Sequence, residues 1–239
     1  MRSDGRRSDE LRDVTIQTGV SAYAEGSALI SLGRTRVLCT LTVEDIQPRW
    51  MAQQGKSGGW LTAEYAMLPR ATAQRTPRET AGLGGRTQEI RRLIGRSLRA
   101  ALDLEKLGPR TCILDCDVLQ ADGGTRTAAI SGGYVALAAG LQELARRGEL
   151  PHGVVKSAVA AVSVGLCDGL PCLDLCYEED SRADVDANVV MNAEGHFIEV
   201  QVSAEGSAFR RAQLDTLLNL AYKGIGQLLA AQREALGLG

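Results

Sequence analysis

Alternating apolar and polar residues predict several β-strands in the first third of the chain. The predicted strands lie over 13–18, 26–32, 35–45 and 60–67. Gly33-Arg34-Thr35 lies between two of these segments and predicts a hairpin turn. The following stretch, 68–83, contains prolines, a glycine and three arginines, so we expect a mobile loop there.

After this loop the apolar residues recur at helical spacing. They predict a helix over 88–107, with a buried stripe formed by Ile90, Ile94, Leu98 and Ala101. A strand over 111–119 is expected next. A second helix, rich in alanine and leucine, is predicted over 127–147 and should end at Gly148.

The second half of the chain repeats the order of strands followed by a helix. Strands are predicted near 156–167, 171–177, 184–191 and 196–202, and a C-terminal helix over 207–234. The segment 148–153, which contains glycine, proline and histidine, is the best internal boundary and divides the chain into 1–150 and 151–239. The whole pattern predicts an α+β protein with mixed sheets and helices packed on them.

The composition is that of a globular protein without a strong net charge. Of the 239 residues 44% are hydrophobic and the net charge is −2, so contact with nucleic acid would need a local basic patch. Aromatic residues make up only 4%, which argues against binding nucleic acid by base stacking on aromatic platforms. No apolar run approaches the roughly 20 residues of a membrane helix, and the charged N-terminus does not resemble a secretory signal. We therefore expect a cytoplasmic protein without a membrane partner.

The six cysteines fit the same compartment. Cys112/Cys116 and Cys172/Cys176 have a spacing that suggests zinc pairs. Residues four apart on a strand, however, lie about 13 Å from each other, too far to share one metal ion. We expect small buried hydrophobic residues instead.

Two glycine-rich turns before predicted helices are candidates for binding phosphate. They are Gly84-Gly85-Arg86-Thr87 and Gly123-Gly124-Thr125-Arg126-Thr127. The start of a helix presents unpaired N–H groups to an anion, and an adjacent arginine adds a charged fork. The candidate ligands are Arg86, Gly124, Thr125 and Arg126. Alternatively, the glycines serve only the backbone of two ordinary turns, since no P-loop lysine follows.

A cluster of carboxylates is a candidate for binding metal. Asp184 and Asp186 are two apart on a predicted strand, so their side chains would share a face about 7 Å apart. Asp180 lies in the preceding turn and can fold back towards them. Hard oxygen ligands suit Mg²⁺ or Mn²⁺. The alternative is a solvated acidic loop. Asp115 and Asp117 alternate with apolar residues on a buried strand. They would be paired structural carboxylates or would support the phosphate site from behind its ligands, and we expect the structural role.

Arginines form a third candidate site, for RNA. Three lie in the loop over 68–83 and three on one face of the following helix: Arg70, Arg75, Arg78, Arg92, Arg96 and Arg99. They would follow an RNA backbone through its phosphates, or equally form a solubilising surface or a subunit contact. With two histidines and no hydrolase motif, histidine-based catalysis is not expected. Phosphoryl transfer needs none, because it depends on positioning and charge neutralisation.

Several long motifs resemble the ribonuclease PH family of bacteria. The longest is the segment 114–127, LDCDVLQADGGTRT, and Gly84-Gly85-Arg86-Thr87 and Asn188-Val189-Val190-Met191 also match. Shorter matches are Thr62-Ala63-Glu64-Tyr65, Met67-Leu68-Pro69-Arg70 and Ala160-Ala161-Val162-Ser163-Val164-Gly165. The resemblance covers nearly the whole chain, from Gly5 to the C-terminal helix.

The resemblance implies an activity, a fold and an assembly. The activity is that of a phosphorolytic 3′→5′ exoribonuclease, which trims the 3′ extensions of precursor tRNA reversibly. Inorganic phosphate is the co-substrate and nucleoside diphosphates are released. The implied fold is the α+β RNase PH fold, similar to domain 2 of ribosomal protein S5. The implied assembly is a homohexamer, built as a trimer of dimers.

Matching the motifs residue by residue implies roles for the candidates. In 1–150 the phosphate-binding positions are Arg86, Gly124, Thr125 and Arg126, the last also counted as catalytic. In 151–239 the catalytic, metal-binding pair is Asp180 and Asp186, and Asp184 matches a third, less strict acidic position. The loop that carries Arg70, Arg75 and Arg78 is associated with RNA binding and ring assembly.

Three other classes of protein stay open. A catalytically silent RNA-binding ring subunit would have lost the arginines or the acidic pair, and both are present here. A hydrolytic nuclease would not need a site for free phosphate. A small-molecule nucleotidyl- or phosphotransferase on a similar fold is disfavoured only weakly, by the arginine loop.

Overall fold

A computed structural model describes residues 2, 4–205 and 208–238. Its first five strands are β1 (Val14–Thr18), β2 (Gly26–Leu32), β3 (Thr35–Glu44), β4 (Trp60–Met67) and β5 (Thr111–Gln120). The later strands are β6 (Val159–Cys167), β7 (Leu170–Leu173), β8 (Val185–Asn192) and β9 (Phe197–Ala204). The helices are α1 (Arg49–Gln53), α2 (Gly85–Arg99), α3 (Leu104–Leu107), α4 (Thr125–Arg146), α5 (Tyr177–Asp180) and α6 (Arg211–Ala235).

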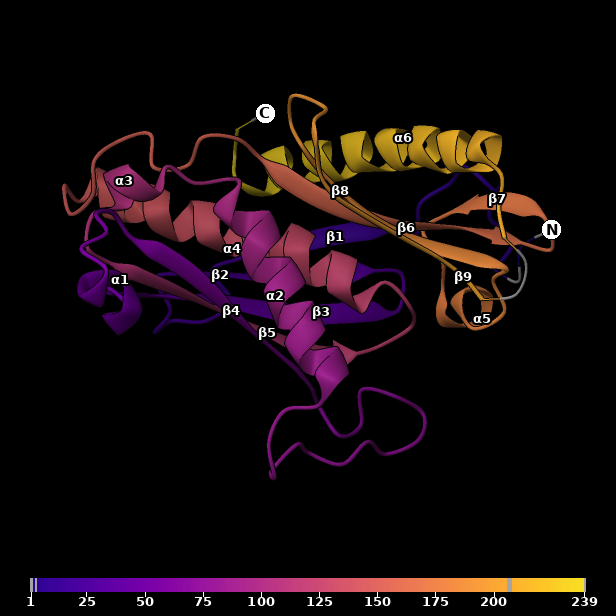
Figure 1. Ribbon diagram of the computed structural model, residues 1–239, viewed down its shortest axis with the longest axis horizontal. Helices are drawn as coiled ribbons and strands as arrows, with labels where there is room; N and C mark the ends of the chain where they lie inside the picture. The colour runs from indigo at the N-terminus through magenta and orange to yellow at the C-terminus, as the bar shows by residue number, and fades with distance from the viewer. Residues whose placement is uncertain (1, 3, 206–207, 239) are drawn as a thin grey trace.

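These strands form two sheets, one in each half of the chain (Figure 1). The first sheet has the order β1-β2-β3-β5-β4, and its strands are antiparallel except for the parallel pair β4 and β5. The second sheet has the order β7-β6-β8-β9 and is antiparallel throughout. The predicted α+β architecture with two groups of strands is therefore confirmed.

Helix α4 connects the two sheets, because it packs against β2 and β3 of the first and β6 of the second. Its residues are buried at every position from Thr127 to Ala138. Glycines allow this close approach: a Cβ on Gly132 would lie 2.6 Å from Ile30, and one on Gly133 would lie 2.6 Å from Leu114. This packing fixes the N-terminus of α4 between the two sheets, where residues of α5 and β8 also lie.

Helix α6 covers the second sheet and is bonded to both α4 and β6. Its apolar face packs against β6 and β7 and consists of Leu217, Ala221, Ile225 and Leu228. The buried Gln232 side chain donates hydrogen bonds to the carbonyl oxygens of Ser131 in α4, at 2.9 Å, and Val159 in β6, at 3.0 Å. None of the helices in the described residues has the length and hydropathy that crossing a bilayer requires.

One predicted helix is divided in the structure, and one predicted strand is shortened. The helix expected over 88–107 is divided, because Asp103 accepts a hydrogen bond from the Lys106 N–H at 3.2 Å and starts the separate α3. The strand expected over 171–177 stops at Leu173, because Asp174 adopts a left-handed conformation with φ of 54° and turns the chain into α5.

Other expectations concern the two ends of the second half. The predicted start of the C-terminal helix, residue 207, lies outside the described residues, and α6 begins at Arg211. The division into 1–150 and 151–239 stays a prediction. Five of the six cysteines are buried, as expected for small apolar residues.

Candidate active site

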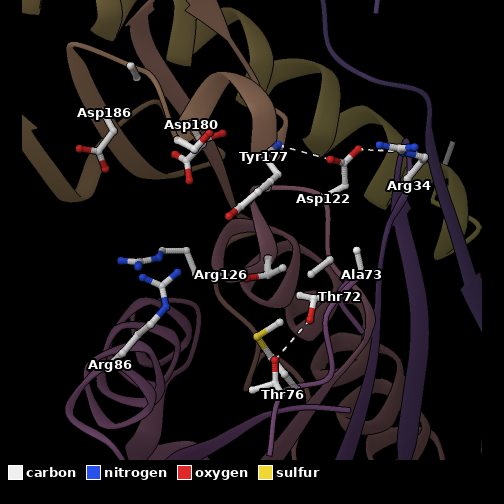
Figure 2. A pocket seen from close by; sticks show the side chains of 18 of the residues that line it. Arg34, Thr72, Ala73, Thr76, Arg86, Asp122, Arg126, Tyr177, Asp180 and Asp186 are labelled. Carbon is white, nitrogen blue, oxygen red and sulfur yellow. Dashed lines mark hydrogen bonds and ion pairs between the residues drawn. The ribbon is translucent and has the colours of Figure 1, made fainter. Parts of the chain in front are cut away.

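An open cleft of about 1220 Å³ contains most of the residues singled out in the sequence. Its walls come from the first turns of α2 and α4, from α5 and from β8. Arg86 and Arg126 lie on one side of it, and Asp180 and Asp186 face them from the other (Figure 2). The fold thus brings together residues of three motifs that are far apart in the sequence.

The arginine side of the cleft begins with the turn 123–126, called the phosphate loop after the role predicted from the sequence. Its Gly123 and Gly124 have φ of 73° and 65°. Such left-handed angles favour glycine and turn the chain directly into α4. A Cβ on Gly123 would also lie 2.6 Å from the Leu175 carbonyl oxygen, so only glycine lets this loop pack against the segment before α5. The next residue, Thr125, is fixed by a 2.8 Å hydrogen bond between its hydroxyl and that of the buried Tyr65.

The two arginines differ in what holds them. Arg126 donates to the Glu89 carboxylate on α2 at 3.2 Å, and the Glu89 side chain is half exposed. A solvated pair of this kind is weak, so the guanidinium of Arg126 stays available to another anion. Arg86 forms no ion pair within the described part of the chain, and its side chain lies on the same side of the cleft as that of Arg126 (Figure 2). Two cationic forks therefore face the same space.

The acidic side of the cleft consists of Asp180 at the end of α5 and Asp186 in β8. Asp180 is accessible from the cleft, but the surrounding protein removes part of its hydration and raises its pKa, and the nearby Asp186 raises it further. Arg126 and Arg86 oppose this shift. The pair therefore carries negative charge that the protein compensates only in part.

One oxygen of Asp186 is suited to a cation. Its Oδ1 is buried and has no hydrogen-bond partner among the described residues, which is costly for a carboxylate. Two carboxylates that are completed by water and substrate oxygens are the usual protein ligands of Mg²⁺. The residues present fit such an ion, and the fit rests on Asp180 and Asp186.

Asp184 lies just before β8 instead of within it. It is exposed at the edge of the cleft, and its Oδ2 accepts a 3.3 Å hydrogen bond from the Gly169 N–H. No group of three carboxylate, histidine or cysteine side chains gathers for a metal within the residues described. The role of Asp184 as a metal ligand stays a prediction.

A buried ion pair between Arg12 and Asp174 connects the segments that form the two sides of the cleft. The Arg12 backbone N–H and side chain donate to the Asp174 carboxylate at 2.6 to 2.9 Å, and both residues are buried. Arg12 also donates to the Asp122 carbonyl oxygen, next to the glycines of the phosphate loop. Since Asp174 precedes α5, Arg12 connects the phosphate loop to the segment that carries Asp180.

We expect Asp174→Ala to lower the free energy of unfolding by about 3–5 kcal/mol, because Arg12 would stay buried without its counter-charge. Chemical denaturation monitored by circular dichroism measures this change. Glu143→Ala is the matched control, because it breaks the exposed pairs of Glu143 with Arg146 and Arg147 and should have a much smaller effect. Equal losses of unfolding free energy in the two variants would show that the buried pair stabilises the protein no more than the exposed pairs do.

The six arginines predicted to bind RNA do not form one surface. Arg75 lines the cleft and Arg70 lines a small adjoining hollow, together with Arg34, while Arg78 is exposed on the same loop. None of the three arginines on α2 lines the cleft. Arg96 pairs with Glu199 at 2.6 Å, Arg99 lies 4.4 Å from the ring centre of Trp60, and Arg92 is exposed. Their contact with RNA stays a prediction.

Several lining residues have no local sequence signal. Tyr177, Arg34 and Arg182 line the cleft, and none belongs to a motif that chemistry alone would single out. Tyr177 lies three residues before Asp180, Arg182 lies two residues after it, and Arg34 lies in a turn between two strands. These positions indicate a shared cleft only once the chain is folded. Asp115 and Asp117 are absent from the lining, and the pKa of Asp115 is raised by partial burial and by Asp117.

A two-sheet α+β fold that sets paired arginines opposite paired carboxylates is typical of an enzyme that acts on phosphate esters. More particularly, the chain belongs to the 3′ exoribonuclease family. The family models for domain 1 and domain 2 match residues 10–140 and 157–224. The predicted fold, the predicted enzyme class and the phosphorolytic 3′ exoribonuclease activity are therefore confirmed.

Relatives and solved structures agree with this membership. Ribonuclease PH of Solibacter usitatus is 56% identical over 98% of both chains, and that of Corynebacterium efficiens is 57% identical over 99% of this chain and 97% of its own. The rice (Oryza sativa) Rrp46 structure has a TM-score of 0.79, with 18% identity over 99% of this chain and 100% of its own. The Archaeoglobus fulgidus exosome with RNA in its active site has a TM-score of 0.80, with 24% identity over 96% and 91%. At these identities the two structures show the fold alone.

Proposed function

We propose that the protein trims the 3′ extensions of precursor tRNA by phosphorolysis, with the reaction centre in the cleft between Arg126 and Asp180. One observation carries the assignment of the site: two arginines at helix starts face two carboxylates across a single cleft. The arginines suit the attacking phosphate, and the carboxylates suit a cation that would bind the scissile phosphodiester. The opposite charges thus place nucleophile and substrate side by side.

Inorganic phosphate would bind at the start of α4. The backbone N–H groups at Gly124 and Thr125 and the guanidinium of Arg126 are donors on one side, and Arg86 is a donor on the other. Phosphate would displace Glu89 from Arg126, because a dianion with several oxygens is a better partner for the fork than one half-exposed carboxylate. Both arginines hold the ion with an oxygen directed at the RNA.

The chemical step is an in-line displacement at the terminal phosphodiester. A phosphate oxygen forms a bond to the phosphorus, and the bond from that phosphorus to the 3′-oxygen of the preceding nucleotide breaks. The released nucleoside diphosphate carries the former phosphate ion as its β-phosphoryl group, and the 3′-oxygen of the shortened RNA takes up a proton. Arg86 and Arg126 stabilise the charge on the equatorial oxygens during this step.

Mg²⁺, or Mn²⁺ in its place, would be held by Asp180 and Asp186, and it would supply neutralisation of charge on the transferred phosphoryl group. The unpartnered Oδ1 of Asp186 supports this assignment. Asp184 at the rim is a candidate third ligand. Asp180 on α5 and Asp186 on β8 direct their carboxylates towards the position of the cation. Their negative charge repels other anions from that position.

The upstream RNA would pass along the loop 68–83, where Arg70, Arg75 and Arg78 are available to its phosphates. The same loop extends away from the body of the molecule (Figure 1), so it is also free to contact a neighbouring subunit. We propose a homohexameric ring, a trimer of dimers, that acts in the cytoplasm. The likeness of the fold to exosome assemblies supports a ring.

A precursor tRNA with a labelled 3′-terminal nucleotide tests the reaction when it is incubated with Mg²⁺ and with or without inorganic phosphate. We expect labelled nucleoside diphosphate to appear only when phosphate is present. Release of nucleoside monophosphate in both cases would instead identify a hydrolase. Binding of the RNA without any release would identify a silent ring subunit, and light scattering of the same sample gives the oligomeric state.

A further inference from the structure

Tyr177 is an exposed aromatic residue inside the cleft. Its side chain is 67% exposed although it belongs to the first turn of α5, and Figure 2 shows the ring pointing into the pocket. No other aromatic side chain lines the cleft within the part of the chain that the structure describes. The ring is open to water at this position, and a substrate bound in the cleft would cover it.

The backbone that carries this ring is fixed from three directions. The Tyr177 N–H lies 3.4 Å from the Asp122 carboxylate, and the phosphate loop packs so closely that a Cβ on Gly123 would lie 2.7 Å from the Tyr177 nitrogen. Two residues further on, Glu179 accepts two 2.6 Å hydrogen bonds from Arg2. The ring is therefore presented from a rigid support between the phosphate loop and the acidic pair.

We propose that Tyr177 stacks on the base of the 3′-terminal nucleotide of the RNA. This inference rests on the proposed function, because it needs the terminal phosphodiester near Asp180, three residues along the same helical turn. Every base has a π-face, so stacking holds the end of the chain whatever its sequence. That property is what an enzyme needs when it removes successive, different nucleotides.

The rest of the lining favours stacking over reading of the base. Met67 and Pro77 add apolar surface to a cleft whose other residues are mostly charged or small. Arg86, Arg126, Asp180 and Asp186 are assigned above to phosphate and metal, Arg34 pairs with Asp122, and Arg182 pairs with Glu178. A flat base stacked on the Tyr177 ring is held without a specific hydrogen bond, and the cleft is open enough for each new terminal nucleotide to enter.

The proposal predicts a defect in RNA binding that depends on the ring and not on the hydroxyl. We expect Tyr177→Ala to raise the KM for RNA by between about fivefold and 150-fold, while the KM for phosphate changes little. Tyr177→Phe should restore the KM for RNA, and Tyr177→Leu, which keeps apolar bulk without a ring, should not. Tyr222→Ala is the matched control, because Tyr222 is 60% exposed on α6, outside the cleft.

A fluorescent base gives a direct readout of stacking. RNA that ends in 2-aminopurine is bound to each full-length variant with Mg²⁺ and without phosphate, so that no turnover occurs. We expect quenching on binding to the unchanged protein, to Tyr177→Phe and to Tyr222→Ala, and loss of quenching in Tyr177→Ala and Tyr177→Leu at saturating protein.

The outcomes separate this inference from the proposed function. If the unchanged protein releases no nucleoside diphosphate with phosphate, the proposed function fails first. If it does release it but Tyr177→Ala binds and quenches like the unchanged protein, stacking is wrong. If Tyr177→Phe is as impaired as Tyr177→Ala, the hydroxyl acts instead of the ring, which also overturns the proposal.

Discussion

Replacing Asp180 by asparagine should lower kcat by about a thousandfold or more, a size comparable to the loss of one group that stabilises transition-state charge. Asparagine has almost the same shape but removes the charge that would hold the cation at the phosphodiester. The affinity for RNA should change little, because we propose that the RNA is held by the loop 68–83 and the cleft walls. Single-turnover assays with labelled RNA separate the chemical step from binding.

The same substitution should not destabilise the protein. The pKa of Asp180 is raised by partial desolvation and by Asp186, so the charged carboxylate disfavours the folded state at any pH above that pKa. This cost disappears as the pH falls and the folded protein binds the proton. Asp180→Asn removes it at neutral pH, so the melting temperature of the metal-free protein should stay equal or rise. Activity and stability then move independently.

A companion variant makes the result specific. Asp184→Asn should lose much less kcat, because the Asp184 carboxylate already accepts a hydrogen bond from the Gly169 N–H at the rim. An equally large loss there would add Asp184 to the metal ligands. A kcat of Asp180→Asn close to that of the unchanged protein would contradict the metal assignment altogether.

The pattern of apolar residues predicted most of the strands and the long helices. These elements have a regular period that one face of a sheet or helix imposes on the sequence. It failed where one side chain changes the path of the backbone: Asp103 starts α3, and the left-handed Asp174 ends the strand before α5. Such changes depend on single hydrogen bonds and angles, which leave no periodic signal.

The candidate site was predictable where it is local in sequence. Gly123 and Gly124 before Thr125 and Arg126 form one continuous motif, a second glycine-rich turn marked Arg86, and the spacing of the carboxylates marked the acidic pair before the resemblance to a known family supported all three. The contribution of Arg12 was not predictable, because its partners Asp122 and Asp174 are 110 and 162 residues away. Only the packing of α4 between the sheets brings these segments together.

The arginines of α2 illustrate the same limit. Helical spacing places Arg92, Arg96 and Arg99 near one another, but it does not say what lies opposite each side chain. In the fold Arg96 meets Glu199 of β9 and Arg99 meets Trp60 of β4. A charged stripe in a sequence is therefore weak support for a nucleic-acid surface until the neighbouring elements are known.

Arg126→Ala should raise the KM for phosphate by about 10- to 150-fold, since a hydrogen bond to a charged group contributes about 1.5–3 kcal/mol. The KM for RNA should change far less, because Arg126 lies at the start of α4 next to the glycine loop. Initial rates at varied phosphate with saturating RNA measure the effect. Arg92→Ala is the matched control, since it removes an exposed arginine from α2, outside the cleft.

Glu89→Gln then tests whether Glu89 competes with phosphate for Arg126 or helps Arg126 to bind it. The Glu89 carboxylate accepts a 3.2 Å hydrogen bond from Arg126, so it competes with phosphate for the guanidinium. Removing its charge should leave the KM for phosphate equal or lower, opposite to the effect of Arg126→Ala. If Glu89→Gln instead raised this KM as strongly as Arg126→Ala, Glu89 would have to orient Arg126 for binding, and the displacement of Glu89 by phosphate would be wrong.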